Sequence, residues 1–255
     1  MDCYVINLER SPDRLDQMRR EFERLNLKFI RVSAVDGQNL SDDEYARHAG
    51  PRKLSRAQIG VLLSHQKCWD LFSKSRADYC AIFEDDVHLS DSLPEILKSI
   101  EFTTAKFDIL KIETAKKKIL ISRKIQSSIA SRRMRKIGSY HVGAAGYILN
   151  RNCLAKINRL VDVADTIPVD EFLFEYLIDH AEIWQIDPAL AIQDQAEGVR
   201  NRTNLKSLIA NESSKKNRSI FNKFIREITR PIKNLIIYKF GLKLFYYKRE
   251  KIDFI

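Results

Sequence analysis

The stretch Tyr79-Cys80-Ala81-Ile82-Phe83-Glu84-Asp85-Asp86-Val87 joins an apolar run to three consecutive carboxylates. A short, wholly apolar run predicts a strand buried on both faces, and open α/β sheets bind ligands at the carboxyl edge of such strands. Alternate residues of an extended chain point to the same side, so Glu84 and Asp86 could face one cation while Asp85 turns away. Two hard oxygen ligands suit Mg²⁺ or Mn²⁺, with water and a substrate diphosphate at the remaining positions. The alternative is an acidic turn that caps a helix expected near residues 90–100.

Strand-like and helix-like segments alternate on both sides of this stretch. Helices are predicted over 11–25, from the capping box that begins at Ser55, from Asn150 to residue 160, and over 169–178. Strands are predicted over 3–7, 29–33, 107–112, 142–149 and 182–186. The alternation predicts an α/β fold, a mixed sheet flanked by helices.

The composition excludes several classes of protein. The chain has 255 residues, 44% hydrophobic and 31% charged, which excludes collagen, low-complexity disorder and a disulfide-stapled miniprotein. The four cysteines lack C-x-x-C spacing, so no zinc ribbon or redox motif is present, and we expect each to be buried in a reducing compartment. Neither a G-x-G-x-x-G fingerprint nor a P-loop occurs.

The net charge of +10 is concentrated at the C-terminus. Residues 213–255 carry 12 Lys and Arg against 3 Asp and Glu, whereas residues 1–212 carry 32 against 31. Apolar residues over 220–228 share one helical face, and Pro231 separates them from a mixed apolar and basic segment over 232–247. Basic amphipathic helices of this kind lie at anionic membrane surfaces. The alternative is a helix packed on the domain with its lysines solvated.

A second basic segment covers residues 111–136. It holds ten Lys and Arg and one acid, Glu113. Its part over 113–136 lacks clear periodicity, so we expect a mobile basic loop there. No apolar run approaches the roughly 20 residues of a membrane-spanning helix, and the N-terminus shows no secretory signal pattern. These features predict a cytoplasmic protein with a folded domain over 1–212 and a membrane-surface anchor over 213–255.

Seven short blocks in order resemble glycosyltransferase family 25, the bacterial lipooligosaccharide hexosyltransferases. The blocks lie between residue 3 and about residue 195, which is three-quarters of the chain, and together they are specific although each is weak alone. They are Val5-Ile6-Asn7-Leu8-Glu9-Arg10-Ser11-Pro12-Asp13-Arg14, Arg31-Val32-Ser33-Ala34-Val35-Asp36-Gly37, Gly60-Val61-Leu62-Leu63-Ser64-His65, Phe83-Glu84-Asp85-Asp86-Val87, Gly143-Ala144-Ala145-Gly146-Tyr147, Pro168-Val169-Asp170 and Asp187-Pro188-Ala189-Leu190.

The resemblance implies a GT-A-like nucleotide-sugar-binding fold, a divalent cation (Mn²⁺ or Mg²⁺) and a UDP-galactose or UDP-glucose donor. It also implies an inverting hexose transfer to a lipid-linked oligosaccharide acceptor, by an enzyme placed on the inner face of the bacterial inner membrane. The Glu84-x-Asp86 pair matches the D-x-D-type metal motif of such enzymes, with Glu in place of the first Asp.

An inverting transfer needs a base that deprotonates the acceptor hydroxyl. Asp170 is the favoured candidate because it begins a predicted helix in an apolar neighbourhood, where burial would raise its pKa. Glu171 and Asp194 are reserves. Asp is also a common helix N-cap, which is the structural alternative for Asp170.

The remaining predicted donor-binding residues are Asn7, Arg10, Arg14, His65, Asp85, Gly146 and Asp194. Asn7, Arg10 and Arg14 follow the first strand, where an arginine could neutralise phosphate or stack on uracil, although Arg14 could equally be a solvated helix residue. A lone helical histidine such as His65 is more often structural than functional. Gly146 permits either a sugar-binding floor or a tight strand crossing, and Gln193 with Asp194 could close the donor pocket.

Two other functions fit parts of this pattern. One is a metal-dependent nuclease or phosphotransferase, whose nucleic-acid retention would weaken steeply with salt. The other is a non-catalytic membrane or nucleic-acid binding module. The ordered blocks favour the transferase, for which no nucleic-acid partner is expected.

Overall fold

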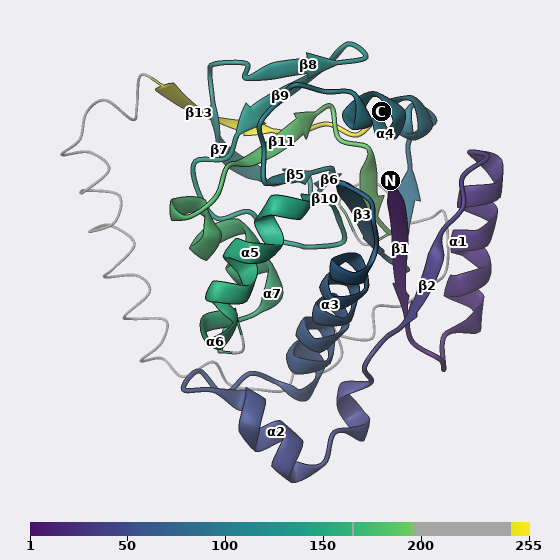
Figure 1. Ribbon diagram of the computed structural model, residues 1–255, viewed down its shortest axis with the longest axis vertical. Helices are drawn as coiled ribbons and strands as arrows, with labels where there is room; N and C mark the ends of the chain where they lie inside the picture. Colours follow the sequence, from purple (N-terminus) through teal and green to yellow (C-terminus); the bar gives the residue numbers. More distant parts are fainter. Residues whose placement is uncertain (165, 195, 197–245) are drawn as a thin grey trace.

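The structure, a computed structural model, describes residues 1–164, 166–194, 196 and 246–255. An eight-stranded mixed sheet forms its centre (Figure 1). In spatial order its strands are β2 (Ile30–Ser33), β1 (Asp2–Asn7), β3 (Tyr79–Glu84), β10 (Gly146–Asn150), β5 (Ile109–Lys111), β11 (Ile183–Asp187), β9 (Arg132–Lys136) and β8 (Ser127–Ile129).

The strand directions bring five carboxyl ends to one edge of this sheet. β1 is parallel to both β2 and β3, and β5 has the same direction because both β3 and β5 are antiparallel to β10. β11 is in turn parallel to β5. The residues that follow β1, β2, β3, β5 and β11 therefore lie along one edge, where α/β sheets bind ligands.

Helices cover both faces of the sheet (Figure 1). Alternate residues of β1 face opposite sides: Tyr4 and Ile6 belong to one buried core, and Cys3 and Val5 to the other. The helical segments are α1 (Pro12–Arg24), η1 (Gly37–Asn39), α2 (Asp42–Ala49), α3 (Arg56–Lys74), α4 (Leu93–Glu101), α5 (Arg151–Arg159), α6 (Val161–Ala164) and α7 (Val169–Glu171), which continues as π-helix over Phe172–Tyr176 and as 3₁₀-helix over Leu177–Asp179.

The structure confirms the α/β class and the mixed sheet flanked by helices. Each predicted strand and helix from 3 to 186 is present, with ends shifted by a few residues. α3 begins at the predicted capping box, in which Ser55 and Gln58 cap each other, and Asn150 caps α5 by accepting a hydrogen bond from the Asn152 N–H. All four cysteines are buried and free, as expected.

The prediction of a mobile basic loop over 113–136 is wrong. This segment forms β6 (Glu113–Thr114), β7 (Lys118–Ser122), β8 and β9. The apolar side chains of Ile119, Ile121 and Met134 are buried. The high charge hid this pattern because two of the arginines, Arg132 and Arg135, are themselves buried and hydrogen-bonded.

The last ten residues pack against the rest of the described fold. β13 (Tyr247–Lys251) pairs antiparallel with β7, and Ile252 is buried in a small third core with Ile119, Ile121 and Ala189. Residues 247–251 belong to the segment predicted as a membrane-surface anchor, and the structure shows that they form a strand of the fold. The amphipathic helices expected over 213–245 lie outside the described residues and stay a prediction. None of the helices in the described residues is long and apolar enough to cross a bilayer.

Candidate active site

A cavity of about 200 Å³ lies at the carboxyl edge of the sheet. Its walls are the loops that follow β1, β2 and β3, one side of α3, and Gln193 at the end of β12 (Ala191–Gln193). Six of the predicted site residues line this cavity: Arg10, Arg14, His65, Glu84, Asp85 and Asp86. The structure therefore brings both predicted metal ligands to the same cavity.

Glu84 and Asp86 occupy the end of β3 and the turn before β4 (Val87–Leu89). Burial, followed by the charges of Glu113 and Asp85, raises the pKa of Glu84 to about 8. Burial and then the charge of Glu84 raise the pKa of Asp86 to about 7, although Arg14 acts in the opposite sense. Two carboxylates held this close together disfavour full ionisation unless a cation compensates them.

Asp85 lines the same cavity as this pair, and Asn7 and Arg14 hold its carboxylate. It accepts hydrogen bonds from Asn7 Nδ2 at 2.7 Å and from Arg14 Nη1 at 2.8 Å. Arg14 Nη1 also lies 3.8 Å from Asp86 Oδ2. Asn7 is buried and Arg14 is 11% exposed, so both fix the acidic turn onto β1 and α1.

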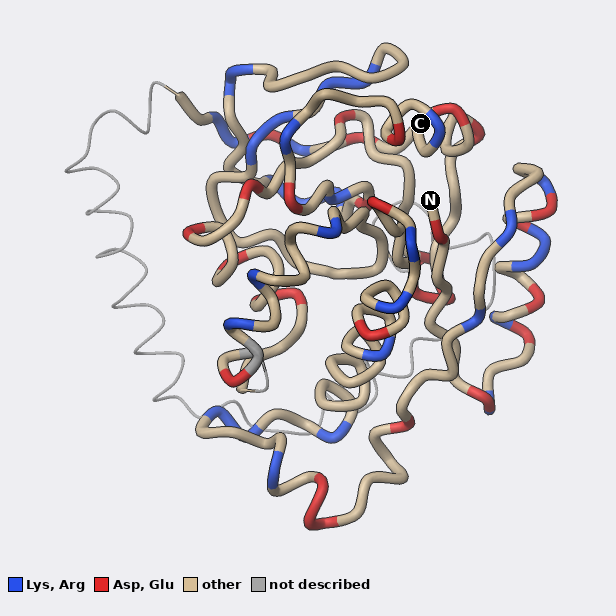
Figure 2. The backbone as a smooth tube through the Cα atoms, viewed as in Figure 1, with Lys and Arg blue, Asp and Glu red and all other residues tan. Residues whose placement is uncertain are grey.

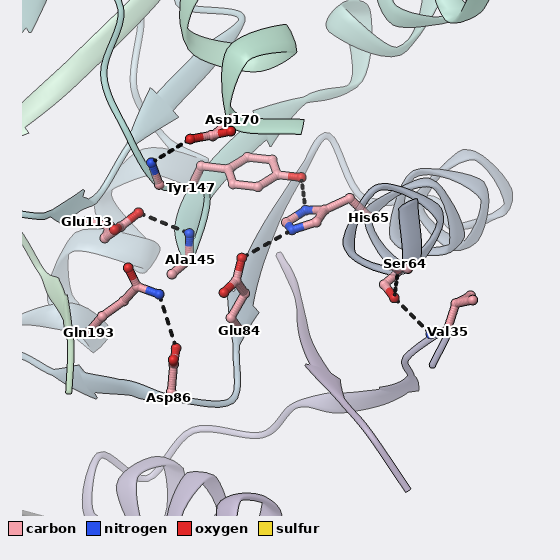
Figure 3. Close-up of polar contacts among 12 residues, drawn as sticks. Val35, Ser64, His65, Glu84, Asp86, Glu113, Ala145, Tyr147, Asp170 and Gln193 are labelled. Carbon is pink, nitrogen blue, oxygen red and sulfur yellow. Dashed lines mark hydrogen bonds and ion pairs between the residues drawn. The ribbon is translucent and has the colours of Figure 1, made fainter. Parts of the chain in front are cut away.

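His65 is buried in α3 and faces Glu84 (Figure 3). Burial lowers the pKa of His65 to about 3, so the imidazole is neutral. Trp69 Nε1 donates to the Tyr147 hydroxyl at 2.9 Å, and this hydroxyl lies 2.9 Å from His65 Nδ1. With Tyr147 donating to Nδ1, the imidazole proton is on Nε2, which points to Glu84 Oε1 at 3.6 Å, beyond hydrogen-bond distance. The His65 side chain is thus held in place by Tyr147 and also lines the cavity next to Glu84.

Two glycines shape the wall opposite the acidic turn. A Cβ on Gly60 of α3 would lie 2.7 Å from the Val35 carbonyl oxygen, and a Cβ on Gly37 would overlap the Arg56 carbonyl. The close backbone approach allows Ser64 Oγ to accept the Val35 N–H at 2.8 Å.

Arg10 closes the outer end of this wall. Its Nε lies 2.8 Å from Asp36 Oδ2, and its Nη1 donates to Gln38 Oε1 at 3.1 Å. Sequence reasoning assigned Arg10 to this edge and missed Asp36 and Gln38, although both belong to the turn that follows the second predicted strand.

Asp170, the predicted base, lies at the start of α7, and Figure 3 shows it on the same side of the sheet edge as His65 and Glu84. Its Oδ2 accepts hydrogen bonds from the Tyr140 hydroxyl at 2.7 Å and the Gly143 N–H at 3.1 Å. The charge of Asp170 raises the pKa of Glu84 and acts in the same direction on His65. These contacts go beyond those of a helix cap.

Glu171, the first reserve, has a different environment. It forms an ion pair with Arg52, Oε2 to Nη1 at 2.5 Å, on the outer side of the same helix. It does not line the cavity.

Glu113 is a site residue that sequence reasoning missed. It lies at the carboxyl end of β5, is fully buried, and accepts hydrogen bonds from Lys111 Nζ at 2.9 Å and from the Ala145 N–H at 3.0 Å. Its Oε1 has no hydrogen-bond partner and would lie 2.6 Å from a Cβ on Gly143. The available signal was an acid directly after an apolar strand, the same signal that identified Glu84.

Asp194 and Gly146 lie behind the cavity. The Asp194 N–H donates to the Asp86 carbonyl oxygen at 2.9 Å, and its carboxylate is hydrogen-bonded to His88. Gly146 is buried where a Cβ would meet Ala191 and Glu113, which describes a tight strand crossing. Gln193 does reach the cavity and donates to Asp86 Oδ1 at 3.3 Å.

The acidic turn fits a divalent cation that shares its ligands with a substrate. Within the described residues, no group of three or more His, Cys, Asp and Glu side chains is arranged to hold a metal ion. Mg²⁺ sites in nucleotide enzymes often use only one or two carboxylates together with substrate phosphates. Glu84, which is half-buried, and Asp86, which is buried, repel each other and provide that donor set.

Relatives of this chain are found in bacteria and in animals. A putative glycosyltransferase of Haemophilus influenzae is 28% identical over 75% of this chain and 70% of its own length. The lipooligosaccharide biosynthesis protein lex-1 of the same species is 26% identical over 91% and 89%. Procollagen galactosyltransferase 1-A of Xenopus laevis is 26% identical over 68% of this chain, which corresponds to 30% of that protein.

Solved structures with a similar arrangement include two glycosyltransferases. The galactosyltransferase LgtC in complex with donor and acceptor sugar analogues has a TM-score of 0.41 at 13% identity, over 72% of this chain and 73% of that one. A glycosyltransferase involved in glycosylation of the major capsid of PBCV-1 has a TM-score of 0.45 at 9% identity, over 78% and 98%.

The strongest finding is the family model described as glycosyltransferase family 25 (LPS biosynthesis protein). It matches residues 1–173 and so covers β1 to α7, including the acidic turn, His65, Glu113 and Asp170. This chain belongs to glycosyltransferase family 25.

Proposed function

We propose that this chain transfers a hexose from a UDP-sugar to a lipooligosaccharide acceptor with inversion at the anomeric carbon, galactose being favoured and glucose the alternative. Membership of the family supports glycosyl transfer. The acceptor class is supported by relatives named for lipooligosaccharide biosynthesis, and galactose by relatives named procollagen galactosyltransferase. The observation that carries the proposal is the convergence of Glu84, Asp86 and Asp170 at one sheet edge.

Glu84 and Asp86 would hold Mn²⁺ or Mg²⁺ together with the donor diphosphate. When bound, such a cation acts as a Lewis acid that stabilises the charge gained by the leaving UDP. Arg14, held against the same turn, adds positive charge on the protein side.

Asp170 would accept the proton of the acceptor hydroxyl. Hydrogen bonds from Tyr140 and the Gly143 N–H orient its carboxylate, and a positioned base of this kind contributes about 10²–10⁴-fold to the rate. We place Glu171 second because its carboxylate is already paired with Arg52.

The donor would occupy the cavity along α3. Arg10, Arg14, His65 and Asp85 border this cavity. Asn7, Gly146 and Asp194 would act from behind it, since Asn7 fixes Asp85 and Asp194 fixes the Asp86 backbone.

A peripheral position on the inner face of the bacterial inner membrane would bring the enzyme to a lipid-linked acceptor. The charge of residues 213–245, nine Lys and Arg against one Glu, supports this position. Cytoplasmic location follows from the need for a nucleotide-sugar donor.

The test is a donor screen with the full chain. UDP-galactose, UDP-glucose and UDP-N-acetylglucosamine are supplied with a deacylated lipooligosaccharide acceptor and either Mn²⁺ or EDTA, and UDP release is followed. We expect release with one donor, its loss in EDTA, and a β-linked product by NMR. Asp86→Asn and Asp170→Asn should each reduce turnover by about 10²–10⁴-fold, while the exposed Asp179→Asn should not.

Three outcomes would contradict parts of this proposal. Undiminished turnover in EDTA would show that the reaction needs no divalent cation. Full activity of Asp170→Asn would show that Asp170 is not the base. Absence of both turnover and UDP binding by calorimetry removes the transferase function itself.

A further inference from the structure

The pair of strands β7 and β13 carries a cluster of exposed cations. We call this cluster the basic ribbon and define it by five residues: Lys118 and Arg249, on the face of the strand pair away from the third core, and Lys117, Arg123 and Lys124, next to the two ends of β7. Figure 1 shows β13 running alongside β7, and Figure 2 shows the Lys and Arg positions along these segments.

Strand pairing gives the ribbon two unlike faces. Ile119 and Ile121 point inward and are buried with Ile252. Lys118 lies opposite Lys251 and Leu120 lies opposite Arg249, so these side chains share the outer face.

The outer face is almost free of compensating acid. Residues 116–124 contain five Lys and Arg and no acid, and residues 246–251 contain three against one, Glu250. Glu250 is already bonded to Arg135 and Lys248. Among the described residues, none forms an ion pair with any of the five cations that define the ribbon.

Apolar and aromatic side chains lie at one end of the ribbon. The Arg123 N–H donates to the Tyr246 carbonyl oxygen at 2.7 Å, which brings residues 123–125 beside the start of β13. The Tyr246 side chain is 58% exposed and Ile125 is 46% exposed. Exposed aromatic and aliphatic side chains among cations are typical of surfaces that enter the headgroup region of a bilayer.

We propose that the basic ribbon is the surface through which the folded domain docks onto an anionic lipid bilayer. The lipid surface is favoured over a nucleic acid because an exposed aliphatic side chain such as Ile125 gains from entering the bilayer interface, whereas it has no partner on a phosphate backbone. The ribbon is also continuous in sequence with residues 213–245, which carry nine Lys and Arg against one acid. Docking through β7 and β13 would fix the orientation of the domain on the membrane.

The experiment is co-sedimentation of the full chain with vesicles of mixed phosphatidylglycerol and phosphatidylcholine, at low and high salt. The ribbon variant is Lys118→Gln/Arg123→Gln/Arg249→Gln. The matched control, Arg19→Gln/Arg20→Gln/Lys74→Gln, removes three exposed cations from α1 and α3. We expect the ribbon variant to partition about 100-fold more weakly, the product of three cation contacts with an anionic surface, and the control to change less than about 3-fold.

Three further readouts separate the alternatives. Because the three substituted side chains are exposed, the melting temperature of the ribbon variant should match that of the wild type, and this match would exclude unfolding as the cause. UDP binding should also be unchanged, so this proposal and the proposed transferase function fail independently. Ile125→Ser/Tyr246→Ser should weaken the binding that survives at high salt.

The proposal is overturned by any of three results. The first is a ribbon variant that binds vesicles as well as the wild type does. The second is a ribbon variant that loses no more binding than the control, which would indicate diffuse electrostatic attraction. The third is retention of the wild type on DNA or RNA with no binding to anionic vesicles.

Discussion

Lys111 and Glu113 form an ion pair in which both side chains are fully buried. The Lys111 ammonium also lies 4.2 Å from the centre of the Phe174 ring and donates to the Gly143 carbonyl. Glu113 in turn receives the Ala145 N–H, and the Ala145 carbonyl receives the Glu84 N–H at 3.0 Å. The pair therefore supports the strand crossing on which Glu84 depends.

Removing one partner of this pair should be more harmful than removing both. A buried charge without its partner costs about 3–5 kcal/mol, whereas a pair replaced by neutral groups can be nearly neutral. We expect Lys111→Met and Glu113→Gln each to lower the free energy of unfolding by about that amount, and the double variant to lose much less than their sum in urea unfolding.

The exposed pair Lys136–Glu182 is the matched control for this cycle. Its coupling should be about 0–1 kcal/mol. Additive losses at Lys111 and Glu113 would show that the two groups act separately.

At the scale of elements, Glu21 joins α1 to the back of the acidic turn. Its Oε2 accepts the Leu89 N–H of β4 at 3.2 Å and Arg24 Nη2 at 2.7 Å, and Oε1 lies 3.9 Å from His88 Nδ1. Burial alone would raise the pKa of Glu21, but hydrogen bonds from His88, Arg24 and the Leu89 N–H outweigh it and lower the pKa to about 2. The ionised carboxylate thus stabilises the contact between α1 and β4.

The pH dependence of this contribution has a definite sign. A carboxyl whose pKa is lower in the folded state stabilises the fold above its unfolded pKa, and this stability is lost as the pH falls towards the folded value. We expect Glu21→Gln to lower the free energy of unfolding by about 1–3 kcal/mol at pH 7, and the difference from wild type to shrink between about pH 5 and pH 2.

Glu23→Gln, on an exposed position of the same helix, is the control and should show little effect at any pH. The measurement is chemical unfolding at a series of pH values. A difference for Glu21→Gln that stayed constant with pH would assign the effect to packing.

At the scale of the whole molecule, the C-terminus completes the catalytic domain. Beyond the pairing of β13 with β7, the Ala189 N–H donates to the Asp253 carbonyl oxygen at 2.7 Å, and Thr114 Oγ1 donates to the Ile252 carbonyl at 2.8 Å. The last ten residues thereby cover the strands that follow Glu113. A chain truncated after residue 212 would lose part of the fold as well as the predicted membrane helices.

Ile252→Ala tests this closure. The side chain is 1% exposed, and removing a buried isoleucine typically costs about 2–5 kcal/mol. We expect a clear fall in melting temperature, whereas Ile255→Ala, on a residue that is 71% exposed, should be nearly neutral. Equal melting temperatures for the two variants would show that the C-terminus packs too loosely to support the domain.

Local patterns predicted much of the fold. Period-two and period-3.6 hydrophobic patterns, the Ser55 capping box and the Asn150 cap depend on residues only a few positions apart, so they located the strands and helices up to residue 186. These patterns failed over 113–136, where the high charge suggested an exposed loop. Charge does not predict exposure where an arginine is buried, as Arg135 is between Asp187 and Glu250.

The sequence by itself determined that an apolar strand delivers Glu84 and Asp86 to the carboxyl edge of an α/β sheet and that Asp170 opens a later helix, because each of these depends on neighbours in the chain. Only the tertiary structure decided which distant groups meet there. Glu113, Tyr140 and the neutral His65 join the site through contacts across tens of residues, and β13 returns to β7 from more than a hundred residues away. Such partners depend on strand order and on the burial of polar groups, and neither is encoded in any short stretch of sequence.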